Sequence, residues 1–344
     1  MLSENFVSAV SNWFRENRRA LPWREGRDPY RIWISEVMLQ QTRIEAVIPY
    51  YFRFLEEIPS VQALALCPEE KLLKLWEGLG YYSRAKNLKK AAEIIVSQWQ
   101  GKIPEEASEL RRLPGIGEYT AGAISSIAFG RPEPAVDGNV LRVLSRVLGD
   151  ESDISKPETK KRMTAILREV YPSGKDAGDL TEGIMEIGER ICIPNGAPAC
   201  TVCPVKGECR AYRENLTASL PVKSVKAARK KIKMTVFLLC FENTFALRKR
   251  EEKGLLAGMW EFYHTDGHLS PAAAREHLSQ MGLCPQAIKK IGSHNHIFTH
   301  LEWDMRGYLV HCEKKIPELV FQTREEIERE TALPTAFHPF LKKI

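Results

Sequence analysis

The spacing of hydrophobic residues changes well past the middle of the chain. From Phe6 to about Tyr212, apolar residues recur at three- and four-residue intervals in runs that Pro and Gly interrupt, which predicts a series of helices. Beyond a basic stretch, shorter runs bounded by turn residues predict strands over 234–241, 245–248, 291–296 and 305–311, and a helix over 270–281. The sequence therefore predicts an all-α part followed by a smaller α+β part.

The basic stretch marks the predicted domain boundary. Residues 214–233 carry six lysines and arginines and few large apolar side chains, so we interpret them as an interdomain linker. A solvated tether explains these charges better than a dedicated binding patch. The predicted domains are then 1–213 and 234–344.

Composition is that of an ordinary globular protein. A length of 344 residues suits about two domains, and 44% hydrophobic with 27% charged residues excludes a disordered chain. No apolar run approaches the ~18 residues of a membrane span, and the N-terminus lacks the order of a signal peptide. We therefore expect a cytoplasmic protein that uses no membrane. The formal charge of +6 suits a polyanionic partner, although many proteins without one share it.

Histidine is absent from most of the chain. All eight histidines lie at or after His264. A catalytic centre in the first 263 residues therefore cannot use a histidine base, a Ser–His triad or a histidine-bound metal. Carboxylates, Tyr, Lys or Cys must perform any chemistry there.

Four of the eight cysteines are clustered in a C-x7-C-x2-C-x5-C run. They are Cys192, Cys200, Cys203 and Cys209. In a cytosolic chain this pattern predicts a four-thiolate metal site instead of disulfides. The spacing leaves zinc possible and suits a compact [4Fe–4S] cluster at least as well. The scattered Cys67, Cys240, Cys284 and Cys312 have apolar neighbours and are interpreted as buried thiols.

Two carboxylates and a hairpin are the candidates for chemistry in the helical part. Glu36 is the only acid between Arg31 and Arg43, and such apolar surroundings raise the pKa of a carboxyl toward the range of a general acid. Asp137 precedes an apolar helical run, where a helix cap is the simpler interpretation. The hairpin at 113–120 contains Gly115 and Gly117, whose exposed backbone N–H groups could bind phosphate unless the segment is a plain turn.

Together these segments resemble the helix-hairpin-helix DNA glycosylases of the endonuclease III superfamily, and specifically the MutY-type adenine DNA glycosylases. The resemblance covers essentially the whole chain. Its motifs are residues 21–24 (LPWR), 35–42 (SEVMLQQT), 76–82 (WEGLGYY), 113–117 (LPGIG) and 136–139 (VDGN), followed by the cysteine run. It implies a six-helix part at 22–130 with the hairpin, an iron–sulfur part formed by 1–21 and 131–213, and a Nudix-like domain at 234–344.

The resemblance also implies residue roles. Glu36 protonates a flipped adenine, while Asp137, supported by Asn139, stabilises an oxocarbenium-like sugar, as paired carboxylates do in glycosidases. The adenine-binding residues are Trp23, Arg24 and Glu182. The residues that contact or wedge into DNA are Gln41, Thr42, Leu79, Tyr81, Gly115 and Gly117. The four clustered cysteines hold a [4Fe–4S] cluster.

Position 119 separates two branches of the superfamily. Strand-cleaving members resemble this chain but carry a Lys there, whose amine attacks the sugar. This chain has Tyr119, which is not an amine nucleophile. The implied enzyme is monofunctional: it removes adenine opposite 8-oxoguanine or guanine in double-stranded DNA, leaves the backbone intact, and is expected to act as a monomer.

The C-terminal domain resembles a Nudix fold without its hydrolytic acids. Ser279 and Gln280 stand where the paired glutamates of the Nudix box hold Mg²⁺. In the glycosylase family the domain instead recognises 8-oxoguanine through a Phe-Ser-His loop, matched here by Phe298, Thr299 and His300. The chain departs from the family pattern at two places. Thr299 stands where serine is usual; it keeps the hydroxyl, so we expect recognition to be retained. The first two cysteines of the run are separated by seven residues, one more than is usual.

Three other functions compete with this one. A glycosylase for another base, such as mismatched thymine, is disfavoured by Glu36, Glu182 and the appended domain. A DNA-binding scaffold without activity is disfavoured by the two carboxylates together with Tyr119. A Nudix hydrolase with a DNA-binding appendage is disfavoured by Ser279 and Gln280.

Overall fold

The computed structural model describes residues 2–224 and 228–344. These residues form two compact units, one of residues 2–66 with 87–224 and one of residues 67–86 with 228–344. Lys226, one of the six basic residues of the predicted linker, lies outside the described residues. None of the helices described is long and apolar enough to span a membrane.

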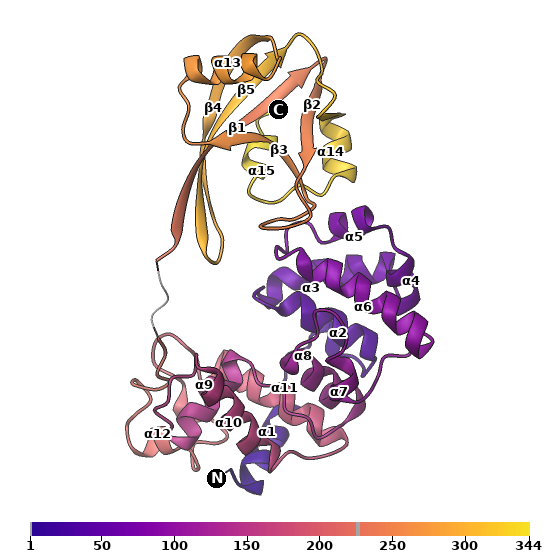
Figure 1. The fold of residues 1–344 in the computed structure, drawn as a ribbon. Helices are drawn as coiled ribbons and strands as arrows, with labels where there is room; N and C mark the ends of the chain where they lie inside the picture. The colour runs from indigo at the N-terminus through magenta and orange to yellow at the C-terminus, as the bar shows by residue number, and fades with distance from the viewer. Residues whose placement is uncertain (1, 225–227) are drawn as a thin grey trace. The chain divides into compact units, whose positions relative to one another are not determined.

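The first unit is helical, as the hydrophobic spacing predicts (Figure 1). Its α-helices are α1 (Glu4–Asn17), α2 (Pro29–Leu39), α3 (Ile44–Glu57), α4 (Val61–Leu66), α7 (Ala107–Leu110), α8 (Glu118–Ala123), α9 (Gly138–Leu148), α10 (Pro157–Arg168), α11 (Lys175–Arg190) and α12 (Arg210–Arg213), with most of α6 (Ser83–Trp99). One core joins α1, α9 and α11 through Phe6, Val140 and Ile184. The N-terminal helix therefore packs against segments from far along the chain.

The second unit contains a six-stranded mixed sheet in the order β4-β5-β1-β3-β2-β6 (Figure 1). The strands are β1 (Lys230–Phe241), β2 (Thr244–Lys249), β3 (Trp260–Asp266), β4 (Pro285–Ile297), β5 (Leu301–Cys312) and β6 (Val320–Thr323). β1 runs parallel to β5, and the other pairs given are antiparallel. The sheet confirms the predicted α+β class.

Helices cover both faces of this sheet because β1 is apolar on both. Val236 and Leu238 contribute to the core shared with α14 (Arg324–Glu330) and α15 (His338–Leu341). Phe237 and Leu239 contribute to the core shared with α13 (Pro271–Gln280). Successive residues of a strand point to opposite faces, so one apolar run supplies both cores.

A short segment of the helical region belongs to the second unit. Residues 67–86, which include α5 (Glu69–Leu75), pack with residues from 228 onward, and α5 contacts α14. This grouping could not be read from local spacing, since α5 has an ordinary helical pattern. The proposed domain bounds of 1–213 and 234–344 stay a prediction.

The structure differs from two sequence expectations. The predicted linker is partly folded, because Leu220 is buried in the core of the first unit and β1 begins at Lys230. Cys284 is exposed where a buried thiol was expected, because it lies in the connection between α13 and β4, whereas Cys67, Cys240 and Cys312 are buried.

Candidate active site

The helix that carries Glu36 is mostly buried. Asp28 caps α2 by accepting a hydrogen bond of 3.0 Å from the Arg31 backbone N–H, and Pro29 occupies the first turn. With Trp33, Ile34 and Val37 in the core, α2 has no polar face for Glu36, which is 7% exposed. The apolar surroundings predicted for this carboxyl are therefore present.

Tyr119 reaches Glu36 from α8. Its hydroxyl donates a hydrogen bond of 2.7 Å to Glu36 Oε2. Burial raises the pKa of Glu36 to about 7; the Tyr119 hydrogen bond opposes this rise, and the charges of Glu182 and Asp137 add to it. The pKa of Tyr119 is raised well above its usual value, first by burial and then by the Glu36 charge, so the phenol stays a proton donor.

Asp137 is both a helix cap and a member of this cluster. It is the N-cap of α9, where Oδ1 accepts a hydrogen bond of 2.8 Å from the Val140 backbone N–H. Oδ2 accepts a second bond of 3.0 Å from Asn139 Nδ2. Burial raises the pKa of Asp137 and these hydrogen bonds lower it. Asp137 can therefore be both a helix cap and a catalytic carboxylate, because capping uses one oxygen and the side chain also lines the cavity described next.

The carboxylates line one cavity of about 830 Å³. It brings together most of the predicted residues of the first unit: Trp23, Arg24, Glu36, Gln41, Thr42, Tyr119, Asp137, Asn139 and Glu182. The hairpin residues Gly115 and Gly117 lie outside its lining, between α7 and α8. Gly115 has a φ of +77°, and a Cβ there would stand 2.7 Å from Asn87 Cβ, so glycine is required.

An ion-pair network that the sequence analysis missed holds the adenine-binding candidates. Arg24 donates to Glu182 Oε1 at 2.6 Å and to Glu186 Oε2 at 2.9 Å. The Glu186 side chain is fully buried and also accepts a bond of 2.6 Å from Arg19. Asp179, Glu182, Glu186 and Glu189 recur at three- and four-residue spacing on α11, and that acidic face is the signal that could have found Glu186.

A second missed residue, Arg142, lies between Asp137 and the cysteine run. Its Nη2 donates to Asn139 Oδ1 at 2.7 Å, and Asn139 in turn donates to Asp137. Its Nε donates to the Cys192 carbonyl at 2.7 Å. Arg142 is buried and its pKa is lowered, first by desolvation. Arg142 therefore connects Asn139, which holds Asp137, to Cys192, the first of the clustered cysteines.

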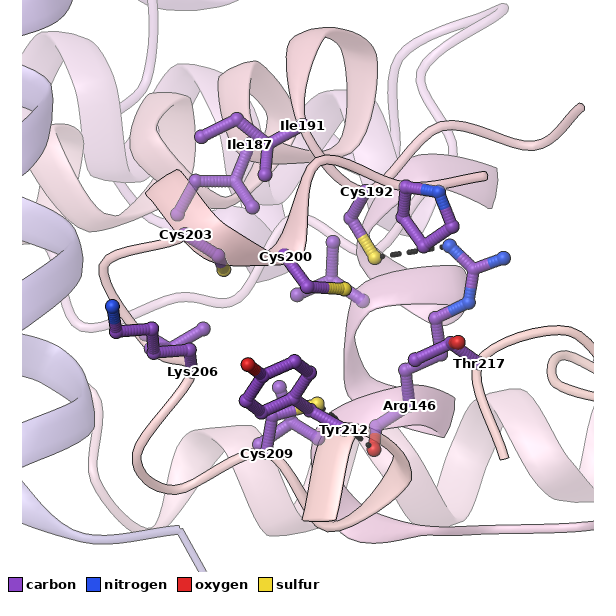
Figure 2. A pocket seen from close by; sticks show the side chains of 14 residues that line it. Arg146, Ile187, Ile191, Cys192, Cys200, Cys203, Lys206, Cys209, Tyr212 and Thr217 are labelled. Carbon is purple, nitrogen blue, oxygen red and sulfur yellow. Dashed lines mark hydrogen bonds between the residues drawn. The ribbon is translucent and has the colours of Figure 1, made fainter. Parts of the chain in front are cut away.

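The four clustered cysteines line a single pocket beside α9 and α11 (Figure 2). Arg146 Nη1 donates to Cys192 Sγ at 3.2 Å, which would stabilise a thiolate. Burial raises the pKa of Cys203 to about 11, so this thiol is protonated unless a metal displaces the proton. No group of three or more His, Cys, Asp or Glu in the described part of the chain is placed to hold one metal ion.

The predicted 8-oxoguanine loop lies in the second unit, on a cavity of about 450 Å³. The cavity is lined by Tyr81 and by Phe298, Thr299 and His300. The hydroxyls of Tyr81 and Thr299 are hydrogen-bonded at 2.5 Å. Leu79, a predicted DNA contact, is only 6% exposed and does not project from its turn.

Both predicted wedge residues have left-handed backbone. The φ of Gln41 is 59° and that of Tyr81 is 47°. Neither is a glycine, and non-glycine residues in this region cost free energy that persists mostly at functional sites. They are two of seven non-glycine residues with positive φ in the described part of the chain, so the backbone is compatible with the predicted wedge role without being specific to it.

Comparisons with known proteins agree with this arrangement. The family model of the HhH-GPD superfamily base excision DNA repair proteins matches residues 34–170, and a NUDIX domain model matches residues 235–343. The adenine DNA glycosylase of Buchnera aphidicola subsp. Schizaphis graminum (strain Sg) is 34% identical over 86% of this chain and 84% of its own length. That of Homo sapiens is 32% identical over 91% of this chain and 68% of its own length.

Solved structures share the fold of the helical part. A thermostable thymine-DNA glycosylase has a TM-score of 0.56 at 28% identity and covers 61% of this chain and 97% of its own. Endonuclease III in a non-covalent DNA complex has a TM-score of 0.52 at 24% identity and covers 63% of this chain and 99% of its own. At this identity the similarity supports the fold alone. From the curated relatives and the two family models, the chain belongs to the adenine DNA glycosylases, enzymes of base excision repair that hydrolyse the N-glycosyl bond of adenine in DNA.

Proposed function

We propose that this glycosylase excises adenine paired with 8-oxoguanine or guanine in duplex DNA, as a monomer and without breaking the strand. The observation that carries the proposal is the buried Glu36 carboxyl, which has a pKa of about 7, receives the Tyr119 hydrogen bond and shares a cavity with Asp137. A general acid is most effective when its pKa lies near the working pH.

The two carboxylates divide the chemistry. Glu36, partly protonated at neutral pH, donates a proton to a ring nitrogen of the flipped adenine and makes the base a better leaving group. Asp137, whose carboxylate accepts hydrogen bonds from Val140 and Asn139, stabilises the positive charge that develops on the sugar. Tyr119 is a hydrogen-bond donor without an amine, so no Schiff base forms and the strand stays intact.

The remaining predicted residues hold the DNA. Trp23, Arg24 and Glu182 contact the adenine that enters the cavity. Gln41 and Tyr81 wedge into the duplex, and Thr42 and the hairpin residues Gly115 and Gly117 contact its backbone. The buried Leu79 supports the turn that carries Tyr81. Phe298, Thr299 and His300 recognise the base opposite the adenine. Their cavity, with the Tyr81 and Thr299 hydroxyls at its edge, supplies the polar groups that distinguish 8-oxoguanine from guanine.

The clustered cysteines fit a [4Fe–4S] cluster. Cys192, Cys200, Cys203 and Cys209 supply four thiolates around one pocket, and Arg146 offers a positive charge to the first of them. These cysteines would hold the cluster, and the 192–209 loop would then be cross-linked to itself beside α9. Purified protein should be brown and absorb visible light; colourless protein with bound zinc would contradict this assignment.

An end-labelled duplex with one A·8-oxoguanine pair tests the function, with and without alkali after incubation. Cleavage at the adenine only after alkali supports base excision without strand cleavage. Breaks without alkali would contradict the role given to Tyr119. A parallel duplex with a T·G pair addresses the thymine alternative, and we expect no cleavage there.

A further inference from the structure

The segment 67–86 is attached to the C-terminal part of the second unit by a half-buried charge on α5. Lys74 Nζ donates to the carbonyls of Ile327 at 3.3 Å and Thr331 at 3.0 Å. Both carbonyls lie at the C-terminal end of α14, where backbone oxygens lack partners within the helix and a positive charge is favourable. The Lys74 side chain is 22% exposed, so this contact is largely shielded from water.

Glu77 completes the attachment from the other side. Its Oε2 pairs with Lys74 Nζ at 2.5 Å, and its Oε1 accepts a hydrogen bond of 3.3 Å from the Leu333 backbone N–H. His338 Nε2 lies 2.9 Å from the same oxygen. The Glu77 side chain is 14% exposed. The pair therefore satisfies backbone groups at the end of α14 and in the turn that leads from α14 to α15.

The attached turn leads directly to the predicted recognition cavity. Four residues after Glu77, Tyr81 contacts Thr299 through its hydroxyl. Gly78 and Gly80, between the two, have φ values of 103° and 69°, so the chain turns sharply here. A shift of Glu77 would accordingly be transmitted to Tyr81 over a very short path.

An exposed ion pair between the same parts of the unit differs from this contact. Glu70 approaches Lys249 at 3.7 Å, and its side chain is 68% exposed. Exposed pairs of this type contribute little to stability or geometry. Lys74 and Glu77, by contrast, combine low exposure, bonds to backbone groups of the opposite segment and proximity to Tyr81.

We propose that Lys74 and Glu77 are positioning residues that fix Tyr81 against the Phe298–His300 loop and thereby set the preference for 8-oxoguanine over guanine. The inference rests on the proposed function of that loop. Neither side chain lines the recognition cavity, so both act through Tyr81 and not on the base.

The test measures single-turnover rates of adenine release from A·8-oxoguanine and A·G duplexes. The variants are Glu77→Gln and Lys74→Met, and the matched control is Glu70→Gln, which lies on α5 with Lys74. We expect the ratio of the two rates to fall about three- to tenfold in the first two variants, with the A·G rate nearly unchanged. The control should keep the wild-type ratio.

The double variant Glu77→Gln/Thr299→Ala separates positioning from general damage. If Glu77 acts through the loop, the double variant should have the ratio of Thr299→Ala alone. An unchanged ratio in Glu77→Gln and Lys74→Met, while Thr299→Ala lowers it, would overturn this inference and leave the proposed recognition intact. Equal losses on both duplexes with a lowered melting temperature would overturn it as well. A wild-type enzyme without preference would overturn the proposed recognition itself.

Discussion

Replacing Tyr119 with phenylalanine tests the origin of the acidity of Glu36. The phenol donates to Glu36 Oε2 at 2.7 Å and thereby stabilises the carboxylate form. Its removal leaves the buried carboxyl with less stabilisation of its charge, so the pKa of Glu36 should rise above its present value of about 7. A hydrogen bond to a charged group contributes roughly 1.5–3 kcal/mol, which corresponds to about 1–2 pKa units.

The consequence appears on the alkaline side of the pH–rate profile. The proton donor is lost as the pH rises through the pKa of Glu36, so the alkaline decline should move to higher pH in Tyr119→Phe. With a pKa raised from about 7 to about 8, the protonated fraction at pH 8 increases about fivefold. At pH 8 the rate relative to the rate at pH 6 should therefore be about fivefold higher than in the wild type.

The assay is single-turnover adenine release between pH 5.5 and pH 9 with the enzyme in excess over DNA. Tyr171→Phe is the control, because Tyr171 is another buried tyrosine and its hydroxyl bonds to Thr181 instead of Glu36. An alkaline decline that stays in place, or moves to lower pH, in Tyr119→Phe would refute the assignment of Glu36 as the acid that Tyr119 tunes.

Three further predictions follow from the same contacts. Asp137→Asn should lower the rate of base release at least about 100-fold, because the negative charge is lost while Asn still caps α9. Duplex affinity in a gel-shift assay should stay within a few-fold of the wild type, and loss of binding would indicate a structural role. Thr299→Ala should reduce the preference for A·8-oxoguanine over A·G about three- to tenfold in competitive cleavage, and an unchanged preference would remove the role of the loop. Glu186→Ala should lower the free energy of unfolding by about 1.5–3 kcal/mol in urea denaturation, because Arg24 loses its fully buried partner and keeps only Glu182; a change below about 1 kcal/mol would contradict that reasoning.

Local spacing predicted much of the secondary structure because each signal depends on neighbouring residues. The apolar setting of Glu36 and the helix that follows Asp137 are both properties of short segments. The boundary at Lys230 was missed because β1 is extended by pairing with β5, where Lys230 stands opposite Leu301. A partner about 70 residues away cannot be read from a local window.

The sequence predicted those site residues that belong to a recognisable motif. Glu186 has no motif of its own, and its importance comes from Arg19 and Arg24, which reach it across more than 160 residues. Arg142 was missed for the same reason, since its contacts with the carbonyls of Gly188 and Cys192 exist only after α9 and α11 have packed.

The grouping of residues 67–86 with the C-terminal part bears on how the protein is made. The ribosome releases this segment before about 140 further residues, and only then does its packing partner begin to emerge. At typical rates of synthesis the interval is about 7–30 s. During that time Lys74 and Glu77 lack the backbone groups that they bind in the finished protein. Completion of the segment around Tyr81 therefore waits until residues 327–338 have been synthesised, and a chain truncated before them would never assemble it.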